Sequence, residues 1–345
     1  MPSRQRDVNI ETIRVVAMFL VVVVHISRLL HKDIWLSAFL WALSFCAVNV
    51  FGLLSGYVGF GSNHRISRFA ELWLQVFYYS AGITVLYWIY QPEAVGTKVF
   101  LKSLFPFSSV AYWYFTAYCG LFFLMPLLDS SIVSLPQRKI RTLLLSLGGV
   151  FCVLSAFRCS PDDILGLGYG YSLTWLCMLY LFGAYLRKYG WLSRHGCFFW
   201  IIGYFVSVTL LLFCDIASKR LEIFVLKQYT NSYAALPAVI SAICVLGICT
   251  HISIPIVFQK IISSISPYAF GVYLLHTHPL VFKTFFVNNT SNPLYNILNQ
   301  GWGFTAIIVA IGIFSIGILI DSIRGFLFKY IKIQNRLCVF DKWYV

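Results

Sequence analysis

Ionisable side chains interrupt the first apolar run of the chain, and their spacing places them on one face of a helix. Arg14 and His25 are eleven residues apart, which turns an α-helix through about 1,100 degrees, or three turns plus about 20 degrees. Glu11 lies three residues before Arg14 on the same stripe. A histidine titrates near neutral pH and can act as a base or nucleophile, and a guanidinium pairs well with phosphates. One helix face therefore carries an acid, a cation and a histidine.

Two interpretations of this face remain open. Glu11 and Arg14 can form an ion pair at the membrane interface, with His25 a packing histidine near the other end of the helix. Against this, ionisable groups inside an apolar span are costly and usually face a cavity or pathway. The alignment of the three residues favours the functional interpretation.

A second group of candidates follows the next apolar run. Ser55-Gly56-Tyr57 ends this run, and a basic loop with Arg65 and Arg68 comes after it. The group can be a glycine-rich helix end with interfacial anchors. It can also form a mouth that attracts phosphates, since arginines pair with them.

A third group lies late in the chain, where Gly271 to His276 is followed by His278. Two histidines two positions apart on a helix point in different directions, so we predict no metal site there. His276 can be a packing residue or can line a site. The ten cysteines are scattered singly and form no cluster with metal-ligand spacing.

The elements that must position these residues are membrane spans. Of the 345 residues, 59% are hydrophobic and 11% are charged, and the mean hydropathy is +0.79. Apolar runs of about 20 residues recur along the whole chain, and this is the length that crosses a bilayer as a helix. The sequence predicts an all-α polytopic bundle of about ten transmembrane helices. The predicted spans are 9–30, 35–60, 70–90, 111–128, 141–158, 172–187, 197–215, 233–251, 264–287 and 302–324.

The charges indicate how the chain is oriented. Its net charge is +14, but lysines and arginines lie between the apolar runs rather than in one basic face, so we predict no nucleic-acid partner. They are more frequent in the loops on the side of the two termini, which predicts that both termini are cytoplasmic. We predict one integral-membrane domain over residues 1–345, without a separate soluble domain.

Taken together, these stretches resemble the acyltransferase family 3 of integral-membrane acyltransferases. The family begins with an acidic residue, an arginine three positions on and a histidine eleven beyond it, which Glu11, Arg14 and His25 match. Later segments of the chain also resemble family segments, in the same order. These are Ser55-Gly56-Tyr57 with Arg65 and Arg68, Tyr112-Trp113-Tyr114, and Gly271-Val272-Tyr273-Leu274-Leu275-His276. The resemblance covers nearly the whole chain, and Glu11 departs from it mildly, because aspartate is common there.

The resemblance implies an O-acyltransferase of the bacterial cytoplasmic (inner) membrane. Such an enzyme moves an acyl group, most often acetyl, from cytoplasmic acetyl-CoA or another acyl-CoA to a hydroxyl of a surface polysaccharide or its lipid-linked precursor. Acyl-CoA is then a substrate, and no cofactor is permanently bound. Some members carry an added hydrolase-like domain, for which no room follows residue 324.

For such a reaction, the chemistry of these side chains suggests a role for each. Arg14 would hold a phosphate or carbonyl of CoA with Glu11 orienting it, and His25 would be the general base or a transient acyl carrier. Arg65 and Arg68 would attract the donor. Further substrate-binding residues would be Tyr57, Trp113, Tyr114 and His276.

Two other classes of protein remain as alternatives. A glycan or lipid transporter or flippase would line its pathway with Arg14 and His25 and do no chemistry. A glycan polymerase is also a multi-span protein, but it usually needs one large outer loop, which this sequence lacks. Membrane lipids are expected partners in every case, and assembly into a homo-oligomer is left open.

Overall fold

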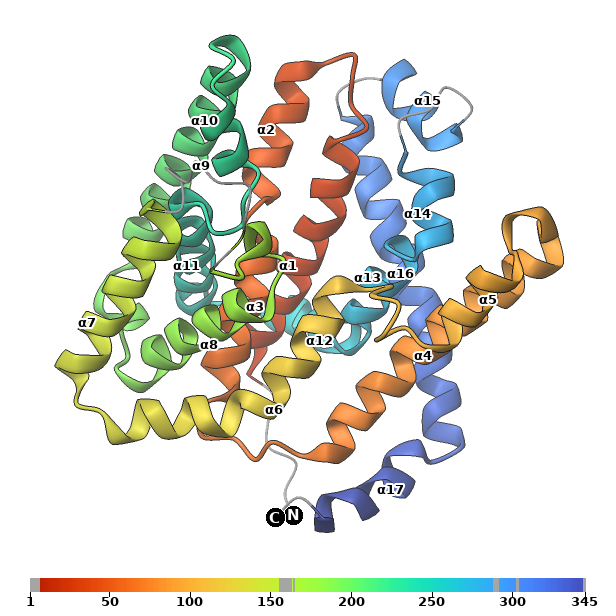
Figure 1. Cartoon of the computed structure of the whole chain (residues 1–345), viewed down its shortest axis with the longest axis horizontal. Helices are drawn as coiled ribbons and strands as arrows, with labels where there is room; N and C mark the ends of the chain where they lie inside the picture. The colour runs from red at the N-terminus through yellow and green to blue at the C-terminus, as the bar shows by residue number, and fades with distance from the viewer. Residues whose placement is uncertain (1–6, 155–162, 164, 288–291, 302–303, 344–345) are drawn as a thin grey trace. The chain divides into compact units, whose positions relative to one another are not determined.

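A computed structural model describes residues 7–154, 163, 165–287, 292–301 and 304–343 (Figure 1). The chain is 81% helical, and the described residues include no strand, which confirms the prediction of an all-α protein. Away from its ends, a helix pairs its backbone N–H and C=O groups within the segment, and this is the solution that a lipid solvent favours.

Six helical segments in the described part of the chain are long and apolar enough to cross a membrane. This supports a membrane protein with several spans, while the number of about ten and the cytoplasmic position of both termini stay predictions. The six are α1 (Val8–Ser27), α2 with α3 (Ile34–Gly59), α4 (Ile66–Tyr90), α6 (Trp113–Ser134), α9 (Cys197–Arg220) and α16 (Thr305–Tyr330).

The other four predicted spans are shorter or broken helices. The apolar run 264–287 is divided into α13 (Ala269–His276) and α14 (Pro279–Phe285). Pro279 starts α14, because a proline cannot continue the preceding helix but fits a first turn. The remaining three regions hold α7 (Gln137–Gly148) with a π-turn after it, α8 (Leu173–Lys188) and α11 (Leu236–His251).

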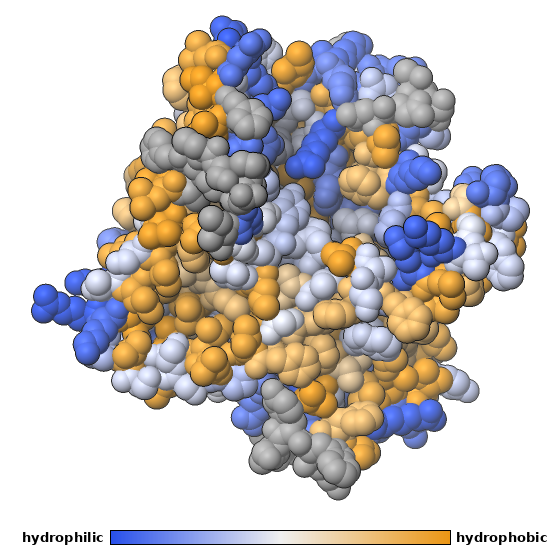
Figure 2. Space-filling model, viewed as in Figure 1, coloured by the Kyte–Doolittle hydropathy of each residue, from blue (hydrophilic) through white to orange (hydrophobic). Residues whose placement is uncertain are grey.

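Large apolar side chains lie exposed on several of the spans. Phe198, Phe205 and Phe213 of α9 are examples, with exposed fractions of 54% or more. Figure 2 shows hydrophobic residues on the visible surface over α4 and over α6. Continuous apolar surface of this extent fits contact with lipid rather than water.

Contacts divide the chain into two compact units. The first unit contains residues 1–21, 38–63 and 117–266. The second unit contains residues 22–37, 64–116 and 267–345. Helix α1 begins in the first unit and ends in the second.

In the first unit, α3 (Ala47–Gly59) and α8 approach each other through glycines. A Cβ atom at Gly56 would overlap the carbonyl of Tyr180, and one at Gly183 would overlap the carbonyl of Leu53. Small residues at such crossings let two helix backbones touch, as is common in membranes. The Gly56 of the Ser-Gly-Tyr motif is therefore a packing residue.

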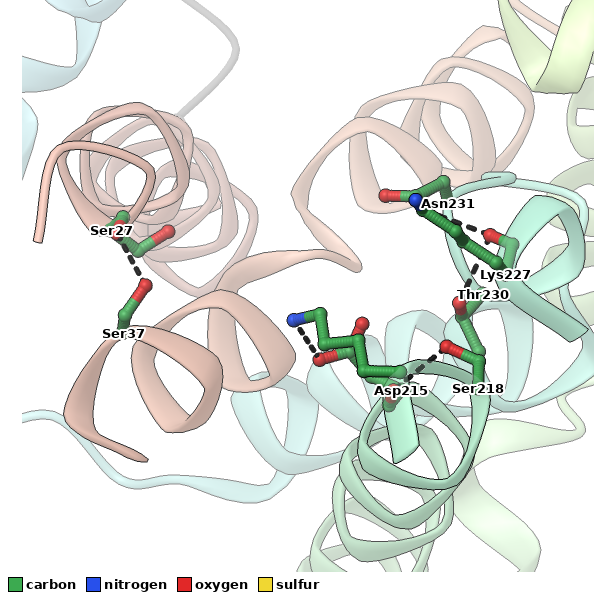
Figure 3. Close-up of polar contacts among 8 residues, drawn as sticks. Ser27, Ser37, Asp215, Ser218, Lys227, Thr230 and Asn231 are labelled. Carbon is green, nitrogen blue, oxygen red and sulfur yellow. Dashed lines mark hydrogen bonds and ion pairs between the residues drawn. The ribbon is translucent and has the colours of Figure 1, made fainter. Parts of the chain in front are cut away.

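Polar side chains inside the first unit are bonded to one another. Asn49 of α3 is fully buried, donates to the carbonyl of Tyr233 at 2.7 Å and accepts from the indole of Trp175 at 3.0 Å. Near the end of α9, Lys219 pairs with Asp215 at 2.6 Å, and the Ser218 hydroxyl donates to the Asp215 carbonyl (Figure 3).

In the second unit, α13 packs against α16 around a buried ion pair. Arg324 donates to both carboxylate oxygens of Asp321, at 2.7 and 2.8 Å. Asp321 also accepts from Gln75 and Tyr79 of α4. A Cβ atom at Gly271 would overlap Asp321, so glycine is needed where α13 lies on this pair. The network satisfies a charge that would otherwise be costly in the membrane.

The end of α1 and the turn after it are held by two residues of the second unit, Ser37 and Asn299. The Ser37 hydroxyl donates to the Ser27 carbonyl at 2.7 Å and closes the turn into α2 (Figure 3). Asn299 of α15 (Pro293–Gln300) accepts from the backbone of His31 and donates to the carbonyl of Leu29. These bonds anchor the turn that follows His25.

Candidate active site

Helix α1 carries the three residues of the first motif without a break. Glu11 is buried at 1% exposure, whereas Arg14 and His25 are half-buried. The uninterrupted helix agrees with the predicted common face, since a break would have changed the angle between Arg14 and His25. Glu11 and Arg14 belong to the first unit, and His25 belongs to the second.

Two contacts in the first unit involve the N-terminal half of α1, which carries Arg14. Asn9 donates to the carbonyl of Thr250 at 3.4 Å, which ties the start of α1 to the end of α11. Tyr118 of α6 interacts electrostatically with Arg14. Tyr118 is a residue that the sequence analysis missed, because nothing in its spacing relates it to Arg14.

In the second unit, His25 meets His276. The His25 Nδ1 atom lies 3.1 Å from the His276 Nε2 atom, although the residues are 251 positions apart. His276 is 3% exposed, and its Nδ1 atom lies 2.6 Å from the carbonyl oxygen of Val272. The late motif therefore reaches the histidine of the first motif.

The partners of these rings determine their tautomers. A carbonyl oxygen only accepts hydrogen bonds, so the Nδ1 atom of His276 carries the proton. The Nε2 atom of neutral His276 is then an acceptor, and the Nδ1 atom of His25 must donate to it. This leaves the Nε2 atom of neutral His25 with a lone pair. His25 is thus held in the form that can accept a proton or attack a carbonyl.

Aromatic rings surround the histidine pair. The ring centres of Phe282 and Phe286 lie 5.5 and 6.4 Å from that of His25, and Phe286 lies 5.8 Å from His276. The two phenylalanines stack on each other at 5.5 Å. An apolar wall of this kind keeps water away and strengthens the polar interactions beside it.

His278 has a different environment from His276, as their spacing predicts. Its Nδ1 atom accepts from the backbone of Leu280 at 3.3 Å, and its Nε2 atom lies 3.2 Å from the carbonyl oxygen of Ser80. Both ring nitrogens therefore have structural partners, and the residue caps α14.

The predicted donor-binding arginines lie at the start of α4. Arg65 directly precedes the helix, Arg68 is in its first turn, and both are exposed. Between them, Ser67 binds the carboxylate of Asp341 through its backbone nitrogen at 2.8 Å and its hydroxyl at 2.7 Å. These arginines form a cluster separate from the histidine pair.

The predicted aromatic residues are divided between the two units. In the first unit, the guanidinium of Arg187 lies over the ring of Tyr57, 5.1 Å from its centre. In the second unit, Trp113 and Tyr114 start α6 with their rings edge to face at 5.6 Å. Their neighbour Tyr112 is buried and donates to the carbonyl of Leu274, the turn before His276. Tyr112 therefore anchors α13.

Asp321 and Arg324 form a charged pair that the sequence analysis did not single out. The predicted span 302–324 ended at Arg324, whereas α16 continues to Tyr330 and buries both residues. Their spacing of three in an apolar run was the signal that could have found them.

The fold and its apolar spans define a helical membrane protein with a contact between two histidines inside one of its units. A family model described as an acyltransferase domain matches residues 7–321, nearly the whole chain. The chain belongs to this acyltransferase family, the acyltransferase family 3 that its motifs resemble. No curated protein and no solved structure matches the chain.

Proposed function

We propose that this membrane acyltransferase moves an acyl group, most often acetyl, from acyl-CoA to a hydroxyl of a surface glycan or its lipid-linked precursor. The observation that carries the proposal is the chain of contacts from the Val272 carbonyl through His276 to His25. It gives neutral His25 the tautomer in which Nε2 is the proton-accepting nitrogen.

The reaction begins when His25 Nε2 removes the proton of the acceptor hydroxyl. The oxygen attacks the thioester carbonyl, a new C–O bond forms, and the C–S bond to CoA breaks. The CoA thiolate that leaves then takes this proton from His25. During this cycle His276 accepts from the Nδ1–H of His25, which orients the ring and stabilises its cationic form, as a carboxylate does in other catalytic triads.

A second route uses the same atom as a nucleophile. His25 Nε2 would then attack the thioester itself, carry the acyl group and pass it to the acceptor. A burst of CoA release without acceptor distinguishes this route from the first.

Arg14 has the role of a donor clamp. Its guanidinium binds a phosphate or the pantetheine carbonyl, and Glu11 on the same face orients it. Arg65 and Arg68 attract the polyanionic donor from the cytoplasm. Arg14→Lys is then expected to weaken acyl-CoA binding, because a point charge replaces a bidentate donor. Unchanged affinity would exclude the clamp.

The test is acyl transfer by the purified protein in lipid nanodiscs. Labelled acetyl-CoA should release free CoA in step with acylation of a glycan acceptor, and His25→Ala should abolish both. His31→Ala is the matched control, because this histidine is exposed and follows α1. Full activity of the His25 variant would overturn the proposed base, and glycan transport without CoA release would support a transporter instead.

The acceptor is identified by mass spectrometry of surface glycans. Cells with and without the gene should differ by the mass of one acyl group on one sugar. This also tests the proposed bacterial cytoplasmic membrane location, since the acceptor must be accessible there.

A further inference from the structure

The C-terminal segment of the second unit turns back onto the start of α4. After α16, Lys332 adopts a left-handed conformation with φ 53°, which is uncommon for a residue with a side chain. The chain then forms α17 (Ile333–Leu337) and a 3₁₀-helix (Cys338–Trp343), and both pack against α4. The segment from Lys332 to Trp343 is called the C-terminal strap below.

The strap supplies a cap that α4 lacks. Arg65, at the N-cap position of α4, forms no capping hydrogen bond through its side chain. Asp341 takes this role from 274 positions away, with one carboxylate oxygen on the Ser67 backbone nitrogen and the other on the Ser67 hydroxyl. A negative charge at this end of a helix is favoured by the unsatisfied N–H groups and the helix dipole.

The docking of the strap depends on the negative charge of Asp341. Beyond Arg324 the chain carries Lys329, Lys332, Arg336 and Lys342, and its one acidic residue is Asp341. The strap is therefore basic and packs against α4, whose start carries two more arginines, Arg65 and Arg68. Repulsion between these cations opposes docking, so the single carboxylate between Arg65 and Arg68 provides the attraction.

The groups around the Asp341 carboxylate are also the donors that a phosphate requires. A backbone N–H, a hydroxyl and two flanking guanidinium groups suit a carboxylate and a phosphate alike. The hydrogen bonds from Ser67, followed by the charges of Arg65 and Arg68, lower the pKa of Asp341. The Asp341 carboxylate, from a distant part of the chain, thus already occupies this anion-binding position at the start of α4.

We propose that Asp341 is an internal competitor for the phosphate groups of acyl-CoA, so that donor binding at Arg65, Ser67 and Arg68 displaces the C-terminal strap. The inference rests on the proposed function for the identity of the donor. The strap makes the enzyme less sensitive to low donor concentrations, because a docked strap must leave before the phosphates enter.

Cys338 offers a reporter for the position of the strap, because it is an exposed cysteine on that segment. A nitroxide attached to Cys338 in the full chain in nanodiscs should be restrained, and Cys338→Ser gives the background from labelling elsewhere. Asp341→Asn should mobilise the label, whereas Asp341→Glu should keep it restrained. CoA should also mobilise the label in the native chain, and pantetheine, which has no phosphate, should not.

Steady-state kinetics provide the second measurement. Asp341→Asn should lower the KM for acyl-CoA on the order of threefold to tenfold with an unchanged kcat, because the fraction of open sites rises. Glu93→Gln removes another exposed carboxylate of the same unit and should leave KM unchanged.

The outcomes separate the two proposals. An immobile label or an unchanged or higher KM in the Asp341→Asn variant overturns the strap, even in an active enzyme. Release of the label by CoA in a chain that transfers no acyl group supports the strap and overturns the proposed reaction.

Discussion

The Nδ1 atom of His25 lies 3.1 Å from the Nε2 atom of His276, and the carbonyl of Val272 holds the far side of the second ring. Two motifs far apart in the sequence therefore meet in one hydrogen-bonded pair. In the proposed function, His25 contacts the substrate and His276 positions the His25 ring.

Replacing His276 should impair the chemical step more than substrate binding. In His276→Phe the Nδ1 atom of His25 loses its acceptor, and the ring can adopt the wrong tautomer. We expect kcat for acyl transfer to fall by about 10²-fold to 10⁴-fold with little change in KM.

His278→Asn is the matched control for this variant, because asparagine is itself a good helix cap and His278 has structural partners only. Its kcat should stay close to that of the native enzyme. Equal losses in both variants would show that the region is merely structural.

Gly56→Ala should destabilise the first unit. The added methyl group overlaps the carbonyl of Tyr180, and a backbone atom cannot move aside as a flexible side chain can. Overpacking typically costs about 1–3 kcal/mol, so the variant should unfold at a lower temperature in detergent.

The comparison variant is Gly82→Ala in α4. A Cβ atom at Gly82 meets nothing within 4 Å. Its unfolding temperature should be unchanged or slightly higher, because alanine has the better helix propensity. A Gly56 variant as stable as this one would exclude close contact between α3 and α8.

Replacing one partner of the α16 ion pair should destabilise the protein more than replacing both partners. Arg324→Met leaves Asp321 buried at 0% exposure without its cation, and loss of one partner of such a pair costs about 3–5 kcal/mol. The double variant Asp321→Leu with Arg324→Met should recover part of this loss, since no charge remains uncompensated.

Lys219→Met tests an ion pair that is partly exposed rather than buried. The side chain of Lys219 is 56% exposed, so its pair with Asp215 should contribute less than about 1 kcal/mol. Thermal unfolding of the three variants side by side checks the order. A loss in Lys219→Met as large as that in Arg324→Met would contradict it.

The docking of the C-terminal strap should depend on pH in the acid range. The pKa of Asp341 in the folded chain lies below its ordinary value, because Ser67 donates two hydrogen bonds to the carboxylate. The carboxylate thus stabilises docking fully above the unfolded pKa and loses this effect as the pH falls through the folded pKa.

Nitroxide mobility at Cys338 provides the titration. The label should remain restrained from pH 7 down to about pH 5 and become mobile only at lower pH. In Asp341→Asn the label should be mobile throughout. Release near pH 6 to 7 would contradict the assignment to Asp341.

Much of the helical framework was predictable because its signals are local. The predicted spans 9–30, 70–90 and 197–215 match α1, α4 and α9 within five residues at each end. The run 264–287 was taken as one span, and the structure divides it at Pro279. An average of hydropathy along the run does not detect such a break. The helix nevertheless ends there, because proline lacks the backbone donor that would continue it.

The candidate site was predictable only in part. Helical periodicity is enough to place Arg14 and His25 on one face, because both lie in one helix. The contact of His25 with His276 depends on the packing of helices 251 positions apart, which a single sequence does not encode locally. The family resemblance named His276 as a site residue, but its role as the partner of His25 came from the geometry.

The buried Asn49 has a consequence for the order in which the protein is assembled. Its partner Trp175 lies 126 positions later in the chain, and Tyr233 lies 184 positions later. During synthesis α3 enters the bilayer while this amide still lacks both partners. The helix must then be shielded, by a neighbouring helix or by the insertion machinery, until the ribosome has made α8 and the segment before α11. Stable packing of α3 thus depends on segments that are synthesised much later in the chain.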